Sequence, residues 1–260
     1  MSTTVDDKAH QFRRAHQQAS ALLMPNAWDP GSAKLIAGVG YAALATSSGA
    51  AAMVLGRKDG QLTRDEALAH ARAIVDAVDV PVSADLENGF GPEPVMAAET
   101  IRLAGAIGLA GGSIEDSPAE DAPYDFNHAV ERVAAAVEAA RALGRPFTLT
   151  ARTENYLRGR PDLDDTIRRL QAFEKAGADV LFAPALPDLD AVRAVCAALS
   201  KPVSFMVGIP SKSFSVAELE AAGVKRISFA TSFYRAAMRM VLAAATEVKE
   251  QGTFNYLRKP

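Results

Sequence analysis

The chain has 260 residues, of which 49% are apolar and 23% are charged, a composition typical of folded globular proteins and unlike that of disordered or fibrous ones. Its net charge of -3 gives no basic field that would attract a phosphate backbone, so the composition excludes nucleic acid as an expected partner. The single cysteine, Cys196, excludes an internal disulfide framework and any metal site built from several cysteines.

The N-terminal segment is polar and precedes a predicted helix at about Asp6–Ala19. It lacks the apolar core of a signal peptide, and no apolar run reaches the roughly 18 to 20 residues of a membrane span. We therefore expect a cytoplasmic protein with no membrane partner. A chain of this length fits one barrel-sized domain and no linker divides it, so a single domain over residues 1–260 is predicted.

Short apolar runs then alternate with segments of helical period along the whole chain, a pattern typical of βα units with a parallel sheet. The eight predicted strands are Ala21–Met24, Ala42–Thr46, Val82–Asp85, Leu109–Ile114, Phe147–Thr150, Val180–Ala183, Val203–Met206 and Ile227–Phe229. Among the intervening helices, Thr63–Val78 opens with a capping-box pattern, and Ala129–Leu143 is followed by Gly144 and Pro146. Eight such units predict a (β/α)₈ barrel of the TIM type.

The last predicted helix runs from Ser232 to about Lys249 and is followed by the tail GTFNYLRKP. It carries Met238, Met240, Val241 and Leu242, more apolar surface than one wall of a barrel needs. We therefore expect this helix to contact another subunit.

The third predicted strand ends in acid, with Asp85 and Glu87 at positions i and i+2 before Gly89 and Gly91. Active sites of (β/α)₈ barrels lie at the C-terminal ends of the strands, and if the strand persists both carboxylates face the same side. Their repulsion is normally offset by a cation, and oxygen ligands favour a hard ion such as Mg²⁺. A polar strand end beside a glycine-rich loop is the alternative interpretation.

Other strand ends supply complementary groups. The fourth ends at Glu115 and Asp116, and the fifth at Arg152 with Glu154 beside it. The second ends in Ser47-Ser48-Gly49, whose hydroxyls and backbone N–H groups suit a carboxylate or enolate oxygen. Acidic groups for a metal, an arginine for a carboxylate and a small-residue anion site together indicate a site for a small oxo acid. Arg152 as a purely structural ion-pair partner is the alternative.

The same residues carry a family resemblance that covers nearly the whole chain. The segments concerned are PNAWDPGSAKLI, TSSGA, PVSADLENGFG, GGSIEDS, ARTENYL, AGADVLFAPAL and SVAELEAAGVKRIS. With these motifs the chain resembles the isocitrate lyase/phosphoenolpyruvate mutase superfamily. The resemblance implies a (β/α)₈ barrel whose last helix is exchanged between neighbouring subunits, a homotetramer built from such dimers, Mg²⁺ with Mn²⁺ as a substitute, and a small carboxylic acid substrate of the 2-oxo acid type.

The resemblance also implies roles for individual residues. Asp85 matches the direct metal ligand of the family, and the carboxylates that hold the waters of the metal are matched by Glu87, Glu115 and Asp59. Ser47, Ser48 and Gly49 match the segment that binds the substrate carboxylate. Arg152 matches the arginine that contacts substrate oxygens, and the same mouth is lined by Trp28 and Asp29.

The chain departs from the family pattern in the loop after the fourth strand. Isocitrate and methylisocitrate lyases carry a Lys-Lys-Cys-Gly-His motif there, and this chain has SPAEDAPYDFNHAVE, with neither lysine nor cysteine. Phosphonopyruvate-processing members place a lysine and an asparagine in this loop, and Asn127 fits better as the N-cap of the following helix. The chain therefore resembles short-loop members of the superfamily.

Tyr124 in this loop is a candidate for covering the closed site, and anchoring of the loop by its ring is the alternative role. His128 is the histidine nearest to the predicted site. The proton donor stays open between a metal-bound water, Tyr124 and Ser48. Cys196, in a helical stretch, is interpreted as a core residue.

The leading hypothesis is a Mg²⁺-dependent lyase that cleaves a carbon–carbon bond of a small 2-oxo or 2-hydroxy di- or tricarboxylic acid through an enolate, by decarboxylation or a retro-aldol step. Its catalytic candidates are Arg152, Glu115, Ser48 and Tyr124. The alternatives are phosphorus–carbon chemistry of the phosphonomutase or phosphonopyruvate hydrolase type, and a non-catalytic protein that binds an oxo acid.

Overall fold

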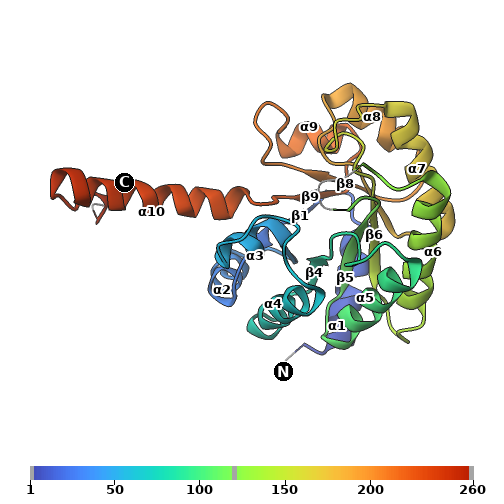
Figure 1. Cartoon of the computed structure of the whole chain (residues 1–260), viewed down its shortest axis with the longest axis horizontal. Helices are drawn as coiled ribbons and strands as arrows, with labels where there is room; N and C mark the ends of the chain where they lie inside the picture. Colours follow the sequence, from blue (N-terminus) through green and yellow to red (C-terminus); the bar gives the residue numbers. More distant parts are fainter. Residues whose placement is uncertain (1–2, 119–121, 258–260) are drawn as a thin grey trace.

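The computed structural model describes residues 3–118 and 122–257 and contains a parallel β-barrel surrounded by helices (Figure 1). The strands pair in the order β1-β9-β8-β7-β6-β5-β4-β3-β2, and every pairing is parallel. Their bounds are β1 Leu22–Met24, β2 Asn26–Ala27, β3 Leu44–Thr46, β4 Val82–Asp85, β5 Gly111–Glu115, β6 Thr148–Arg152, β7 Val180–Phe182, β8 Val203–Met206 and β9 Arg226–Ser228. The predicted α/β barrel is thereby confirmed.

Pro25 accounts for the ninth strand. The first predicted run, Ala21–Met24, contains β1, which pairs with β9; after Pro25 the chain resumes as β2, which was not predicted and pairs with β3. Proline has no N–H group to donate to a ladder, so the strand assignment is interrupted there although the chain continues in the same direction. The carbonyl of Pro25 still accepts from the N–H of Ala45 at 2.9 Å. β1 and β2 are the first and last strands of the sheet, and they are joined in the chain by Pro25 alone. The sheet is therefore closed into a barrel at this residue.

The helices cover the outside of the barrel, with one exception (Figure 1). They are α1 Val5–Ala15, α2 Pro30–Gly38, α3 Ser48–Val54, α4 Arg64–Ala77, α5 Pro94–Ala106, α6 Phe126–Arg141, α7 Leu163–Ala176, α8 Leu189–Ala197, α9 Val216–Ala221, α10 Ser232–Gln251 and the short 3₁₀ helix Asn255–Leu257. The predicted capping box of α4 is present, since the side chains of Thr63 and Glu66 each accept from the other's backbone N–H.

Helix α6 begins earlier than predicted, and its cap differs. Asp125 is the N-cap and its side chain accepts from the N–H of Asn127, which lies inside the first turn. The N-cap role predicted for Asn127 is therefore wrong. An aspartate two residues earlier provides the same type of acceptor, and the sequence alone does not distinguish the two positions.

Phe12 of α1 belongs to the buried cluster that closes one end of the barrel. It is fully buried and clusters with Leu22 and Met24 of β1. Gly111, at the start of β5, makes this packing feasible, because an added Cβ would lie 2.8 Å from Cε1 of Phe12 and 2.5 Å from the carbonyl of Thr148. With this end filled, the opposite end of the barrel remains for a cavity.

Helix α10 is the exception to the barrel wall. It extends away from the rest of the chain over most of its length (Figure 1), and it contains no buried residue. Met240 and Leu242 expose 66% and 68% of their surface. The exchange of this helix between subunits stays a prediction. Among the described residues, no helix is long and apolar enough to cross a membrane.

Candidate active site at the C-terminal ends of the strands

A cavity of about 410 Å³ opens at the C-terminal ends of the strands. It brings together most of the residues singled out from the sequence, namely Ser47, Ser48, Asp59, Asp85, Glu87, Glu115 and Arg152. Residues that sequence reasoning did not place in a site also line it, among them Asn26, Ser113, Arg158, Arg226, Ser228, Thr231 and Arg235. The cavity therefore gathers groups from nearly every strand end of the barrel.

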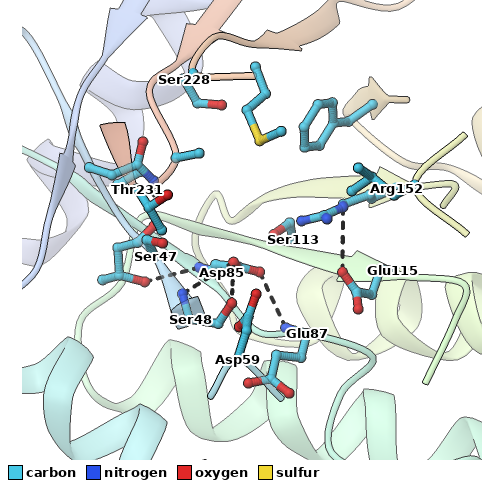
Figure 2. Close-up of a pocket in the computed structure, with 18 of the residues that line it drawn as sticks. Ser47, Ser48, Asp59, Asp85, Glu87, Ser113, Glu115, Arg152, Ser228 and Thr231 are labelled. Atoms are coloured by element: carbon cyan, nitrogen blue, oxygen red, sulfur yellow. Dashed lines mark hydrogen bonds and ion pairs between the residues drawn. The ribbon is translucent and has the colours of Figure 1, made fainter. Parts of the chain in front are cut away.

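Asp85 is the last residue of β4 and is held from the neighbouring strand end (Figure 2). The Ser48 hydroxyl donates to its Oδ2 at 2.8 Å, and the Ser48 N–H donates to the same oxygen at 3.3 Å. Asp59, from the segment between α3 and α4, lies on the same side of the cavity (Figure 2). The small residue Gly49 permits this approach, because a Cβ there would come within 3.1 Å of the Asp59 carboxylate.

Glu87 reaches the cavity by a route that differs from the predicted one. Strand β4 ends at Asp85, and Glu87 has a φ of 49°, in the left-handed region. The expected strand alternation therefore does not extend to Glu87. Its N–H points back at Asp85 Oδ1, 3.4 Å away, and its side chain lines the cavity beside Asp59. The two carboxylates meet because of a turn, not because of a continuing strand.

Asp59, Asp85 and Glu87 form a carboxylate cluster in which the charge of Arg152 offsets the mutual repulsion only in part. Within the described part of the chain, no lysine or arginine forms an ion pair with any of the three. Burial and the neighbouring charges of Asp85 and Asp59 raise the pKa of Glu87 to about 8. Burial and Asp85 likewise raise the pKa of Asp59. Three carboxylates in one partly buried place require a proton or a cation.

The cluster fits a hard divalent cation. Glu87 Oε1 is buried and has no hydrogen-bond partner in the structure, so an acceptor is available there. Taken over residues 3–118 and 122–257, no group of three or more His, Cys, Asp or Glu side chains lies close enough together to hold a metal ion by direct contacts alone. A divalent cation in this cavity would therefore have few direct protein ligands and would retain waters that further carboxylates can hold.

Across the cavity, Arg152 belongs to a buried network of two arginines and two glutamates. Its Nε donates to Glu154 and lies 3.4 Å from Glu115 Oε2. Arg158 approaches the same two carboxylates at 3.5 and 3.6 Å. Burial opposes the charge of Arg152, yet Glu154 and Glu115 raise its pKa above the usual value, so the guanidinium is permanently charged.

The geometry leaves the far end of Arg152 available. Its contacts with Glu154 and Glu115 use Nε, its guanidinium lies 5.3 Å from the centre of the Phe182 ring, and the residue lines the cavity. The two terminal nitrogens can therefore present a fork of N–H donors to a carboxylate or a carbonyl oxygen. Glu154 and Arg158 orient Arg152, and their i, i+4 spacing in ARTENYLR is the sequence signal that could have identified them.

Several predicted residues lie elsewhere. The Asp29 side chain caps α2, accepting from the Ser32 N–H at 2.6 Å, and the Trp28 ring packs edge-on against Tyr234. Neither residue is part of the described cavity lining, and their predicted place at its mouth stays a prediction. Asp116 is buried and pairs with Arg169 at 3.1 Å, which gives it a structural role. The carboxylate of Asp29 is used in a helix cap and that of Asp116 in an ion pair, so their oxygens already have hydrogen-bond partners within the protein.

Tyr124 is likewise outside the cavity lining. Its hydroxyl accepts from Asn88 Nδ2 at 2.8 Å, and the Arg132 guanidinium lies 4.6 Å from the centre of its ring. His128 packs edge-on against the same ring and contacts the Pro92 carbonyl. The structure thus supports the anchoring role for Tyr124. Part of the predicted gating loop, residues 119–121, lies outside the described residues.

Comparison with known proteins agrees with this geometry. The family model described as phosphoenolpyruvate phosphomutase matches residues 12–249. A crystal structure of a proposed lyase/mutase from Burkholderia cenocepacia J2315 is 49% identical, with a TM-score of 0.95, over 98% of this chain and 93% of that one. A proposed phosphonomutase from the same organism is 35% identical, with a TM-score of 0.87, over 96% of this chain and 100% of that one.

Among curated proteins, the 2-methylisocitrate lyase of Escherichia coli (strain K12) is 30% identical over 254 residues, 93% of this chain and 84% of that protein. The family model and this relative both extend across the strand ends that build the cavity. The chain therefore belongs to the phosphoenolpyruvate phosphomutase family and is an enzyme of the phosphoenolpyruvate mutase/isocitrate lyase superfamily.

Proposed function

We propose that the protein is a Mg²⁺-dependent lyase that cleaves a carbon–carbon bond of a small 2-oxo or 2-hydroxy di- or tricarboxylic acid through an enolate. The observation that carries the proposal is the cluster of Asp59, Asp85 and Glu87, which forms no ion pair among the described residues, in one cavity with Arg152. A cation at the carboxylates and an arginine across from them bind two oxygens of the same small acid.

In this proposal the carboxylates hold the metal and Arg152 orients the substrate. Asp85 would be the direct ligand, and Asp59, Glu87 and Glu115 would hold its waters. The bound cation would supply a Lewis acid that polarises the 2-oxo group and stabilises the charge of the enolate. Arg152 binds a substrate carboxylate through its terminal nitrogens, and Glu154 and Glu115 keep its charge and orientation fixed.

Ser48 could act both on the metal site, through Asp85, and as a proton donor to the enolate. Its hydroxyl lies in the cavity and donates to Asp85, so it can fix the orientation of that carboxylate. Of the two side chains considered as proton donors to the enolate, Ser48 lines the cavity and Tyr124 is bound elsewhere. A proton delivered from the cavity side would therefore come from Ser48 or from a water.

Phosphorus–carbon chemistry is the second candidate. It is supported by the phosphoenolpyruvate phosphomutase family model and by the similarity to a proposed phosphonomutase. The carbon–carbon reaction is preferred because a relative that covers nearly the whole chain is a 2-methylisocitrate lyase, and because the loop of residues 117–131 has no lysine.

A substrate panel tests the proposal directly. Oxaloacetate, 2-methylisocitrate, isocitrate, 2,3-dimethylmalate and phosphonopyruvate are followed by NMR, each with Mg²⁺ and with excess chelator. We expect Mg²⁺-dependent loss of at least one carbon acid, above the rate with metal alone. Turnover of phosphonopyruvate alone would assign the phosphorus–carbon alternative. Binding detected by thermal stabilisation, with no turnover of any acid, would favour a non-catalytic binder.

We further propose that α10 packs on a second copy of this chain, in a helix-exchanged dimer that assembles into a tetramer. The helix has no buried residue, and two exposed apolar residues, Leu35 of α2 and its C-cap Val39, lie on the barrel wall. Two uncovered apolar surfaces on one chain are complementary in a symmetric assembly, where each copy both supplies and receives the helix.

Light scattering coupled to size exclusion tests this assembly. Leu242→Asp places a charge on the exposed face of α10 and is expected to lower the oligomer to monomers at micromolar concentration, because burying an unpaired carboxylate in an apolar interface is costly. Val95→Asp, the same type of change at an exposed position of α5, is the control and should leave the mass unchanged. A monomeric wild-type protein would contradict the proposal.

A further inference from the structure

Arg226 is a buried cation of the cavity wall whose charge the protein does not balance. It exposes 4% of its surface, yet within residues 3–118 and 122–257 no acidic side chain forms an ion pair with it. Its Nε donates to Ser204 Oγ at 3.0 Å and its Nη1 to Thr150 Oγ1 at 2.8 Å. Arg152 and Arg158, by contrast, share two glutamates.

The position of Arg226 places it deeper in the barrel than the proposed metal ligands. It precedes Ser228 by two residues on β9, and the cavity is also lined by Ser83 and Ser113, which precede Asp85 and Glu115 by two residues. A strand rises about 3.3 Å per residue, so the cavity continues roughly 6 to 7 Å below the layer of carboxylates. Arg226 belongs to this lower layer.

The energetics of this arrangement require an explanation. Interiors of (β/α)₈ barrels are filled mainly by branched apolar residues, and burying a charge without a counter-charge is strongly unfavourable. Burial lowers the pKa of Arg226 to about 10, so the side chain still carries its charge at neutral pH. Two neutral hydroxyls, from Thr150 and Ser204, only partly replace lost water. A buried positive charge that has no ion-pair partner in the described part of the protein indicates that a negatively charged ligand supplies the partner.

We propose that Arg226 forms a second anion subsite at the floor of the cavity and selects substrates that carry an additional carboxylate distal to the carbon held at the metal and Arg152. This inference rests on the proposed function, because it specifies the acid for the same cavity. Phe182 and Met206 line the same cavity and suit the carbon chain between the two charged ends. The enzyme would thus discriminate dicarboxylates from monocarboxylates of the same size.

The test compares two ligands that differ only in the distal charge. Malate and its β-monoamide, malamate, are titrated into the protein with Mg²⁺ by calorimetry. We expect wild type to bind malate about 10- to 100-fold more tightly, the range for a hydrogen bond to a charged group. Arg226→Met should remove this preference and leave the affinity for malamate within about twofold. Arg72→Met, in an exposed pair with Asp76 on α4, is the matched control and should keep the preference.

Stability provides a second readout. Without ligand, Arg226→Met should be at least as stable as wild type in thermal unfolding, because it removes an unpaired buried charge. If Arg226→Met is strongly destabilised and Arg226→Gln keeps the full preference for malate, Arg226 is a structural residue and the proposal is overturned. Equal affinity of wild type for malate and malamate overturns it as well.

These outcomes separate the subsite from the catalytic proposal. An Arg226-dependent preference for malate with no turnover of any acid in the substrate panel would support the subsite and contradict the lyase. Turnover of a carbon acid by a protein that binds malate and malamate equally well would support the lyase and contradict the subsite.

Discussion

Replacing Asp85 by alanine is expected to reduce turnover by at least about 10³-fold and to abolish its dependence on Mg²⁺. A Lewis acid contributes several kcal/mol to the stabilisation of a developing oxyanion, and each 1.36 kcal/mol corresponds to a factor of ten in rate. Asp85 lies between Ser48 and the other two carboxylates, so no neighbouring side chain can take its place without rearrangement. Turnover is measured on whichever acid the substrate panel identifies.

The same variant should behave differently in stability and in metal binding. Without metal, its melting temperature is expected to equal or exceed that of wild type, because one of three mutually repelling carboxylates is removed. The rise in melting temperature that Mg²⁺ gives to wild type should disappear. Asp76→Ala, which breaks an exposed pair with Arg72, is the control and should change neither property. Full metal-dependent activity in Asp85→Ala would end the proposal.

Replacing Arg152 by methionine is expected to reduce both activity and stability. The change leaves Glu154, which is fully buried, and Glu115 with Arg158 as their remaining cation, 3.5 and 3.6 Å away. Breaking a buried ion pair by removing one partner typically costs about 3 to 5 kcal/mol. Turnover should fall about 10²-fold or more, because the fork of donors for the substrate is lost.

A second substitution separates the two roles of Arg152. Arg152→Met/Glu154→Gln removes a negative charge together with the positive one, so it should recover much of the lost stability in urea unfolding and none of the activity. Arg102→Met, in an exposed pair with Glu99, should cost no more than about 1 kcal/mol. If the double variant regained activity together with stability, Arg152 would be a structural ion-pair partner and not a substrate ligand.

The sequence was most informative where a local pattern has one physical cause. Each of the eight apolar runs predicted as strands overlaps a strand of the barrel, and the capping box at Thr63 begins α4 as expected. A run of apolar residues of strand length between helical segments must be buried on both faces, so neither its existence nor its order depends on distant contacts. The convergence of Asp85, Glu115 and Arg152 then follows from the fold, because parallel strands end on one side.

Other features depended on contacts that a linear pattern does not contain. Glu87 reaches the cavity through a left-handed turn, and Tyr124 is held away from it by Asn88 and Arg132. Asp29 and Asp116 look like candidate acids in the sequence, yet a helix cap and an ion pair with Arg169 use their oxygens. A carboxylate binds whichever donor is nearest in space, and that donor is decided only when the chain has folded.

The sequence by itself determined the barrel, the acidic strand ends and the family, since these rest on hydrophobic period and on residues adjacent in the chain. The tertiary structure alone decided which charges form ion pairs: Arg152 is paired with two glutamates, and Asp85, Glu87 and Arg226 are without an ion-pair partner among the residues described. Charge compensation depends on distances across the barrel between residues far apart in sequence, and in a buried site those distances determine which groups must find a ligand.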